Sequence, residues 1–542
     1  MKLGRRQFIA SGLAAGALAA VWKYSGPFGE ALSGEPLSRI PGAILGASAA
    51  AGHRLRGEKF PEPTRTVKTP VAIVGGGIAG LSAAYALHRA GMKDFQLLEL
   101  EAQTGGNSSS GRNAVSAYPW GAHYVPLLTE ESQVARRLFQ DFGIIKGYDA
   151  QGLPIYDEFF LCADPHERLY LRGRWQDGLV PATGIDAAVE TQYQRFFALM
   201  ESYKTLHGKD GKKIFAIPVD ASSQDERWLA LDKLTMQQWM EQQGFTAEEL
   251  RWYVNYCCRD DYGTTYQETS AWAGLHYFAA RAGRAANADA GAVLTWPQGN
   301  GWLAERLAAP ITANLHAEAI VYRVQDRGSR VWVDYFDQRS NEAVRLEARA
   351  AILAVPRFVA ARLVQPEQSA VQAQGFSYAP WAVANITLDR LPAERGGAPL
   401  SWDNVTYRSP LLGYVTATHQ LTQMHPTQTV LTYYWPLSHL GPDAARAEAL
   451  ARGYPEWRRA FVTELLALHP ELAGHIKQLD VWLWGHAMIR PTAGFIWGGQ
   501  RREALRQHPP IFTAHSDMSG ISIFEEACTH GVQAAERALQ WL

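Results

Sequence analysis

The chain has 542 residues, too long for one ordinary core, so at roughly 150 residues per domain we expect several units or one nucleotide-binding fold with large insertions. Hydrophobic residues make up 47% of the chain and charged residues 19%, which excludes a wholly disordered chain, a coiled coil and a collagen-like repeat. The 52 Lys and Arg nearly cancel the 53 Asp and Glu, and a net charge of -1 does not favour nucleic acid as a partner. The 4 cysteines have no C-x-x-C spacing, so we expect neither a disulfide framework nor a metal site.

The N-terminus has the features of an export signal. An arginine pair, Arg5–Arg6, precedes an apolar run from Phe8 to Trp22, which is short for a membrane span but suits a signal-peptide core. The segment Gly4–Ile9 resembles the bacterial twin-arginine signal. This resemblance implies the twin-arginine translocase as a partner and a periplasmic or otherwise exported protein, without a stable membrane span after processing. The alternative is an accidental arginine pair before an uncleaved anchor. We assign 1–30 to the signal and 31–68 to a leader or linker arm, and we expect the folded enzyme to begin near Thr69.

A dinucleotide fingerprint follows. The β-branched run Val71–Val74 predicts a buried strand, and it leads into a glycine-rich turn and a predicted helix over Leu81–Leu87. The first glycine permits a tight turn, the second lets the backbone approach a pyrophosphate, and the third lets the helix pack on the strand. A second strand, Phe95–Leu98, ends at Glu99, whose carboxylate can accept hydrogen bonds from both ribose hydroxyls. The turn and helix start that we expect to hold the nucleotide are Gly75, Gly77, Ile78, Ala79 and Gly80.

The next segment identifies the dinucleotide by resemblance. Gly105-Gly106 lies six residues beyond Glu99 and opens a polar loop from Asn107 to Arg112. This pattern resembles the flavin-containing amine oxidase superfamily, in which a Gly-Gly pair follows the ribose-binding Glu at this distance and the polar loop runs along FAD. The resemblance implies FAD contacts from Gly105, Gly106, Asn107 and Arg112. Glu101 is a rival ribose ligand. We expect noncovalent FAD, because neither of the family's usual attachment forms is evident.

The resemblance recurs later in the chain. The segment Ile511–Asp517 is similar to the family's last strand, and Phe524–Ala527 is similar to the start of its closing helix. These similarities imply that Asp517 meets the ribityl-phosphate region and that the helix beginning at Phe524 approaches the flavin ring. The strand Ile320–Val324 resembles one that offers a backbone contact to adenine, at Val321. His515 and Glu526 each replace a glycine of the family pattern, so the chain is a divergent member.

These motifs give the expected organisation. The fold class is α/β, with a Rossmann-like FAD-binding domain assembled from three segments and an α+β substrate domain. Helical periodicity is expected over Ala187–Leu206 and Met236–Tyr253, and strands over Trp381–Leu388 and Thr429–Trp435. The expected boundaries are 69–150, 290–365 and 485–542 for the FAD-binding domain, and 151–289 and 366–484 for the substrate domain.

Candidates on the substrate side are less specific. His123 lies where the family places a segment against the flavin ring, so it is a ring contact or proton-handling group, or else a hydrogen-bonded core histidine. The stretch Arg259–Gly263 either binds a cationic substrate or forms a solvated salt-bridge cluster. Tyr433, Tyr434 and Trp435 are candidate aromatic walls for an amine, although strand alternation lets only some of the three face one pocket.

Three further candidates come from the last third of the chain. His486 precedes the last FAD segment and is a candidate proton acceptor near the ring, and Trp497 is a candidate substrate contact. Many amine oxidases of the superfamily carry a Lys that is water-bonded to flavin N5, and Asn385 aligns with that position. An amide cannot supply a positive charge or a proton sink, so this difference favours a dehydrogenase over an oxidase.

The expected function is FAD-dependent hydride transfer from a C–H bond of a small molecule, an amine in the first instance, to flavin N5. The electron acceptor is left open. Two alternatives remain: a desaturase or isomerase-like flavoenzyme acting on an apolar lipid or isoprenoid, and a flavin-binding assembly factor without turnover.

Overall fold

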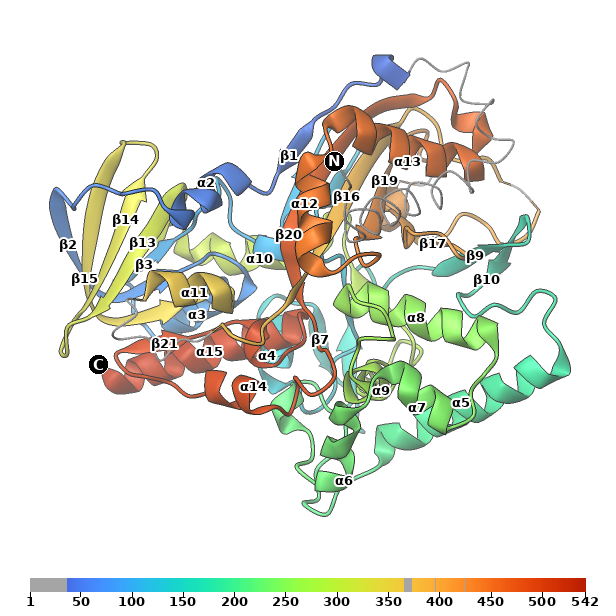
Figure 1. The fold of residues 1–542 in the computed structure, drawn as a ribbon, viewed down its shortest axis with the longest axis horizontal. Helices are drawn as coiled ribbons and strands as arrows, with labels where there is room; N and C mark the ends of the chain where they lie inside the picture. The colour runs from blue at the N-terminus through green and yellow to red at the C-terminus, as the bar shows by residue number, and fades with distance from the viewer. Residues whose placement is uncertain (1–36, 365–372, 395, 424) are drawn as a thin grey trace, which may run out of the picture.

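The computed structural model describes residues 37–364, 373–394, 396–423 and 425–542. The predicted export signal, including Arg5 and Arg6, lies outside the described residues. Two β-sheets organise the chain into two lobes (Figure 1). A 7-stranded sheet forms the core of one lobe, and an 8-stranded sheet forms the core of the other.

The 7-stranded sheet runs in the order β12-β3-β2-β15-β14-β13, with β21 added beside β15. Strands β12, β3, β2 and β15 are parallel, and β21 is parallel to β15. The long strand β15 pairs with β14 over most of its length and with β21 at its end. The strand bounds are β2 Arg65–Val74, β3 Gln96–Leu98, β12 Leu315–His316, β13 Ala319–Asp326, β14 Val331–Asp337, β15 Glu342–Leu353 and β21 Ile511–Thr513. Val71 to Val74 are buried, as expected for a central parallel strand.

Helices cover this sheet and complete the Rossmann-like architecture that the sequence predicts. They are α3 Ile78–Arg89, α4 Gln133–Asp141, α10 Gly301–Ala308, α11 Arg357–Leu363, α14 Gly499–Ala504 and α15 Phe524–Trp541. The first and last of the three predicted segments meet where α15 packs against α3. A Cβ built on Gly531 of α15 would lie 2.2 Å from the carbonyl oxygen of Ala79, so only glycine permits this approach.

The 8-stranded sheet has the order β1-β20-β16-β19-β18-β17-β9-β10. Its bounds are β1 Ile44–Gly46, β9 Glu167–Leu171, β10 Arg174–Asp177, β16 Tyr378–Leu388, β17 Asp403–Thr406, β18 Gly413–Thr416, β19 Thr429–Pro436 and β20 Ile476–Ile489. Helices α12 (Pro442–Ala451) and α13 (Tyr454–Leu468) pack on one face around Trp457 and Phe461. The opposite face carries a second apolar cluster that includes Tyr256 of α8. The sheet therefore separates a layer formed by α12 and α13 from a layer that includes α8.

The first insertion is mainly helical. Its helices are α5 Ala187–Thr205, α6 Glu226–Leu229, α7 Met236–Gln242, α8 Glu248–Tyr262 and α9 Ala271–Ala279. The single helix expected over Met236–Tyr253 is divided into α7 and α8, because Gly244 between them has a φ of +72°, which ends a helix. Three two-stranded sheets complete the fold, pairing β4 (Ser110–Arg112) with β5 (Ala117–Pro119), β6 (Tyr124–Pro126) with β11 (Val293–Thr295), and β7 (Ile145–Tyr148) with β8 (Pro154–Tyr156).

Two boundaries differ from the expectation. Strand β2 begins at Arg65, before Thr69, and residues 37–64 already pack on both lobes through β1 and α2 (Ala49–His53). Strand β20 stays in the 8-stranded sheet up to Ile489, past residue 485. Both differences arise because a strand continues for as long as its backbone N–H and C=O groups find hydrogen-bond partners on a neighbouring strand.

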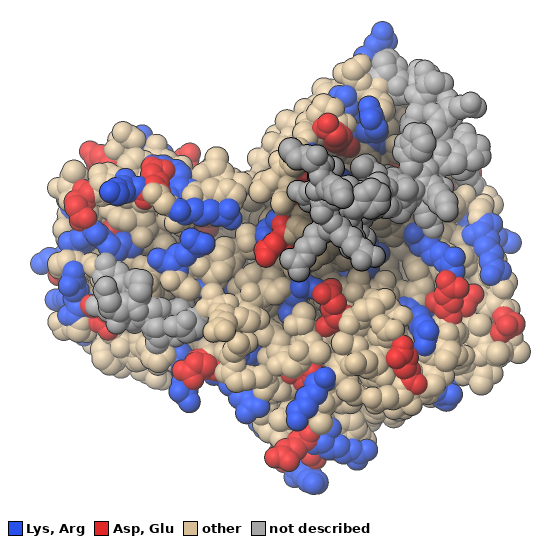
Figure 2. Space-filling model, in the orientation of Figure 1, with Lys and Arg blue, Asp and Glu red and all other residues tan. Residues whose placement is uncertain are grey.

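The face of the molecule in Figure 2 carries charged side chains of both signs. Figure 2 shows Lys and Arg interspersed with Asp and Glu over the face it presents. In the part of the chain that the structure describes, no helix is long and apolar enough to cross a membrane. Within the same part, no group of His, Cys, Asp and Glu side chains could hold a metal ion.

Candidate active site

The two glycine-rich segments meet at the end of β2. Gly77 and Gly105 form a parallel bridge, and the Gly105 N–H donates to the Gly76 carbonyl oxygen at 2.8 Å. Gly75 has a φ of +100°, and a Cβ there would lie 2.5 Å from the Ala354 carbonyl oxygen. The turn therefore needs glycine and exposes backbone N–H groups at the N-terminus of α3, where a pyrophosphate would be bound. Ile78 and Ala79, the first residues of α3, are buried behind the turn.

Glu99 ends β3 with its carboxylate already oriented. Its Oε2 accepts the Gly76 N–H at 2.6 Å and its Oε1 accepts the Glu101 N–H at 2.8 Å. Burial raises the pKa of Glu99 to about 7. The rival, Glu101, has its Oε1 occupied by the Ser48 N–H at 2.9 Å. Backbone N–H groups thus orient both acids, and Glu99 is the one that contacts the glycine turn directly, through Gly76.

Asp517 supplies an unused acceptor at the other end of the cradle. Its Oδ2 accepts the Tyr378 hydroxyl at 2.6 Å and the Arg357 N–H at 2.7 Å. Its Oδ1 is buried and receives no hydrogen bond among the described residues, although His515 Nδ1 lies 3.0 Å away and accepts the Asp517 N–H. A buried carboxylate oxygen without a donor calls for a hydroxyl from a ligand or water. Burial opposes ionisation, but His515, Tyr378 and the Arg357 N–H together keep the pKa of Asp517 below its usual value. This residue fits the ribityl chain of FAD.

The remaining predicted cofactor residues take different positions. Val321 is buried in β13, next to Ala319, whose N–H donates to the Glu99 carbonyl oxygen at 2.8 Å. Phe524 begins α15, and its ring packs against Phe139 in the core. Asn107 donates its amide to the Ala487 carbonyl oxygen, which ties the polar loop to β20. Arg112 lies at the exposed end of β4 and pairs at 3.9 Å with Glu305, so its side chain points to the surface.

Glu526, which replaces a family glycine, has a structural partner set. Its Oε1 accepts the Val219 N–H at 2.6 Å, and its Oε2 bonds the Ser519 hydroxyl, which in turn lies 2.7 Å from His530 Nε2. Burial raises the pKa of Glu526 to about 8. The substitution therefore fastens α15 to the first insertion.

His123 lies in a cluster of aromatic side chains. Its ring stacks on Tyr434 at 4.6 Å between centroids, and Tyr124 and Trp402 lie at 5.2 and 5.5 Å. The Tyr434 hydroxyl donates to the Gly121 carbonyl oxygen at 3.0 Å, which fixes the segment before His123. Burial lowers the pKa of His123 to about 4, so the imidazole is neutral at pH 7.

Carboxylates lie beside this cluster. Asp260 from α8 and Asp403 from β17 both influence the ionisation of Tyr434, and Asp260 also influences that of Tyr124. Burial, Asp261 and Glu167 raise the pKa of Asp260 to about 7, against the opposing effect of Arg281. Burial first, and then Asp260 and Glu167, raise the pKa of Asp403 well above its usual value.

Three of these groups combine partial exposure with strongly shifted pKa values. His123, Asp260 and Asp403 are only half-buried, yet burial is the largest cause of each pKa shift. We infer from this combination that these side chains line a space that is shielded from bulk solvent. We call this space the hollow and define it by the residues around it: His123, Tyr124, Asp260, Trp402, Asp403 and Tyr434. Next to it, Arg281 pairs with Asp261 and donates to the Tyr124 hydroxyl at 3.1 Å.

The structure corrects three substrate candidates. Tyr433 and Trp435 face the layer under α12 and α13, where Tyr433 packs at 6.2 Å from Phe461 and Trp435 at 5.7 Å from Trp457. Side chains alternate along β19, so Tyr434, which lies between Tyr433 and Trp435, faces the other side of the sheet and reaches His123. Trp497 is a core residue that packs edge-on against Trp272 at 5.2 Å.

The sequence identified part of the hollow and missed the rest. The prediction of a solvated salt-bridge cluster at Arg259–Gly263 is wrong, because Asp261 is buried and paired with Arg281. Asp403 and Trp402 had no local signal, and nothing in the sequence set Tyr434 apart from its neighbours Tyr433 and Trp435. Only the pairing of β17 and β19 in one sheet, through β18, brings them together.

His486 and Asn385 lie outside the aromatic cluster. His486 stacks on Phe358 at 4.3 Å, and burial followed by Arg446, Arg56 and His53 lowers its pKa to about 4. Asn385 is buried, donates to the Pro119 carbonyl oxygen at 3.0 Å and accepts from Thr432 at 2.6 Å. Its amide thus anchors the segment that leads to His123.

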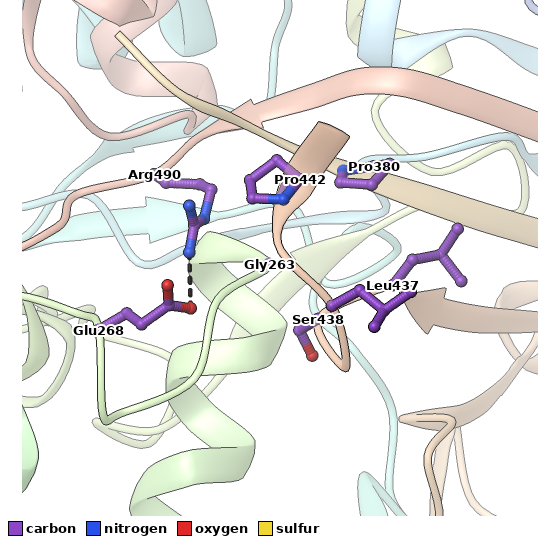
Figure 3. Close-up of a pocket in the computed structure, with 9 residues that line it drawn as sticks. Gly263, Glu268, Pro380, Leu437, Ser438, Pro442 and Arg490 are labelled. Carbon is purple, nitrogen blue, oxygen red and sulfur yellow. Dashed lines mark hydrogen bonds and ion pairs between the residues drawn. The ribbon is translucent and has the colours of Figure 1, made fainter. Parts of the chain in front are cut away.

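A small pocket lies beyond the C-terminus of α8. Figure 3 shows Arg490 and Glu268 joined by an ion pair on its wall, with Nη2 and Oε2 at 2.6 Å. Arg490 also donates to Thr264 and Ser377. The rest of the wall is mainly apolar: Gly263, Ala379, Pro380, Leu437, Ser438, Leu440 and Pro442. With its charges paired, this pocket offers no reactive group.

Comparisons with known proteins identify the family and the fold. The model of the family described as flavin containing amine oxidoreductase matches residues 78–539. A double mutant of putrescine oxidase is 17% identical, with a TM-score of 0.62 over 88% of this chain and 100% of its own. Cyclohexylamine oxidase from Brevibacterium oxydans is 17% identical, with a TM-score of 0.60 over 87% and 98%. A fatty acid isomerase from P. acnes is also 17% identical, with a TM-score of 0.61 over 86% and 98%.

A search of curated protein sequences found no relative. At such low sequence identity, similarity to the solved structures shows the fold alone. This fold is the predicted α/β class with a flavin-binding and a substrate domain. The family match, however, spans most of the sequence. The chain therefore belongs to the flavin-containing amine oxidoreductase family and is an FAD-dependent oxidoreductase.

Proposed function

We propose that the protein oxidises an amine that enters the hollow as a cation. When bound, FAD supplies a hydride acceptor for the C–H bond next to nitrogen. The observation that carries the proposal is the pairing of two carboxylates, Asp260 and Asp403, with the aromatic rings around His123. Asp260, when ionised, attracts an ammonium group, the carbonyl oxygen of the Asp403 carboxyl group can accept a hydrogen bond from it, and electron-rich ring faces hold it by cation–π attraction.

A protonated amine has no lone pair to assist hydride departure, so the hollow must also take up a proton. We assign this role to Asp260, because a pKa of about 7 lets it be ionised when substrate arrives and accept a proton afterwards. His123 remains a ring contact that orients the substrate, since a pKa of about 4 makes it a weak base. His486 is the second candidate for the proton acceptor, but no contact among the described residues links it to the hollow.

The acid groups argue against an apolar lipid or isoprenoid as substrate. A fatty chain would have to displace water from two carboxylates without offering them a donor, at a cost of about 1–3 kcal/mol for each group. A flavin-binding assembly factor would not need carboxylates with raised pKa values beside an aromatic cluster.

Three finer features complete the proposal. FAD is noncovalent, since Cys528, the cysteine nearest the closing motif, is buried within α15. Reoxidation by oxygen is slow, because Asn385 brings no positive charge. The protein is exported through the twin-arginine translocase to the periplasm, by virtue of its Arg5–Arg6 signal.

The test is an anaerobic visible spectrum of the purified protein before and after addition of primary amines and polyamines. We expect the flavin bands to bleach with amines and not with the corresponding alcohols, which carry no cation. Admission of oxygen should then restore the bands slowly, and an added artificial electron acceptor should restore them faster. Bands that persist with every amine would refute amine oxidation, and bleaching by an unsaturated lipid would move the assignment to desaturation.

A further inference from the structure

The segment that precedes β2 is fastened to both lobes. We call residues 37–64 the arm. At its first end Ile40 is buried in the cluster under α13. The Leu479 N–H then donates to the Pro41 carbonyl oxygen at 3.0 Å, and the Val481 N–H to the Ala43 carbonyl oxygen at 2.9 Å. Strand β1 of the arm thus becomes the edge of the 8-stranded sheet.

The second end of the arm packs on the other lobe. Phe60 stacks on Tyr322 of β13 with 4.6 Å between centroids and 3° between planes. Glu62 accepts two hydrogen bonds from Arg323, at 3.0 and 2.6 Å. Ala51 of α2 is buried against the 7-stranded sheet. Figure 1 shows the arm in blue, passing from one lobe to the other.

The middle of the arm reaches the ribose carboxylate. The Ser48 N–H donates to Glu101 Oε1 at 2.9 Å, and the Glu101 N–H donates to Glu99 Oε1 at 2.8 Å. The arm is therefore two hydrogen bonds away from the group that would hold the ribose.

A series of contacts connects the arm to Tyr434 of the hollow. A Cβ on Gly46 would lie 2.4 Å from the ring of Trp482, which stacks at 5.1 Å on Trp120. Trp120 immediately precedes Gly121, whose carbonyl oxygen holds the Tyr434 hydroxyl. A Cβ on Gly42 would lie 1.7 Å from the Leu479 carbonyl oxygen, so the arm fits its groove only with glycines at these points.

We propose that the arm is a clasp that retains the adenosine end of FAD. It bridges both lobes and fixes Glu101, and so it holds Glu99 in the position that receives the ribose. Release of the nucleotide then requires the arm to detach first. The inference rests on the FAD site proposed above, but not on the oxidation of an amine.

Two variants test the clasp without touching the nucleotide. Ser48→Pro removes only the donor to Glu101, since Ser48 has a φ of -69°, close to the roughly -65° of proline. Ser48→Ala is its matched control because it keeps the N–H. Gly42→Ala should detach the first end of the arm from β20, because the φ of +147° at Gly42 and its 1.7 Å approach to the Leu479 carbonyl oxygen both exclude a side chain.

The readouts are the rate of FAD release from holoenzyme, followed by flavin fluorescence, and trypsin cleavage of the arm. We expect S48P to release FAD roughly 5-fold faster than S48A, as for one lost hydrogen bond, and G42A to release it faster still. Bound FAD should slow trypsin cleavage after Arg54, Arg56 and Lys59. If G42A is cleaved faster at these sites and yet releases FAD at the wild-type rate, the clasp is refuted. Failure of every amine to bleach the flavin would refute the proposed function and leave this result standing.

Discussion

Replacement of Gly531 by alanine should destabilise the protein through one contact between α15 and α3. The added Cβ would lie 2.2 Å from the Ala79 carbonyl oxygen and 3.0 Å from Ser82 Cβ. Non-bonded heavy atoms are normally about 3.5 Å apart, so one helix must retreat by about 1 Å. Backbone atoms cannot avoid the clash by changing rotamer, which makes overpacking of this kind cost about 1–3 kcal/mol.

A second effect opposes the clash. Alanine is more favourable than glycine in a helix interior by about 1 kcal/mol. We take the upper part of the overpacking range because the contact is with backbone, and so expect a net loss of about 2 kcal/mol in the free energy of unfolding. Ala79 lies in the first turn of α3, at the pyrophosphate cradle, so flavin occupancy should fall as well.

The assay is urea unfolding followed by tryptophan fluorescence, together with the flavin-to-protein ratio of the purified variant. Gly499→Ala is the control, since a Cβ there meets nothing within 4 Å. Gly274→Ala should fall between the two, because its Cβ meets Met236 Sδ at 2.7 Å and that side chain can move. If G531A matches G499A in both stability and flavin content, the close approach of the two helices is not what glycine is needed for.

Three further predictions concern the hollow and the ribose site. Asp260 has a pKa of about 7, so the KM for a cationic amine should fall as pH rises through 7. D260N should raise KM about 10- to 100-fold and abolish this pH dependence. The check is KM measured from pH 5.5 to 8.5, and a D260N profile identical to that of the wild type would contradict the prediction. Glu99, also with a pKa of about 7, should bind FAD more tightly as it ionises above that pH, and E99Q should weaken FAD affinity about 10- to 100-fold, measured by titration of apoprotein. Y434F loses the hydrogen bond to Gly121 and should lower the free energy of unfolding by about 1 kcal/mol. Y433F should leave it unchanged, because the Tyr433 hydroxyl has no partner in the described part of the chain. Equal melting temperatures of the two variants would refute this difference.

The nucleotide side could be predicted because its determinants are local in sequence. A strand, a glycine turn and a helix form one contiguous unit, and Glu99 follows at the end of the next strand. Backbone requirements of this kind are visible in the residues themselves, since a φ of +100° at Gly75 excludes most side chains. The sequence therefore determined the Rossmann-like fold, and the two glycine-rich segments that it singled out meet at Gly77 and Gly105.

The substrate side was decided by tertiary structure. Its groups come from α8, β17, β19 and the segment before β6, and no short pattern links strands that meet only through sheet pairing. A shift of one residue along β19 exchanges the two faces of the sheet, which is why Tyr434 faces His123 while Tyr433 and Trp435 face α13. Burial likewise depends on what packs around a side chain, so the largest cause of the raised pKa of Asp260 arises in the assembled structure, and the adjacent Asp261 adds to it.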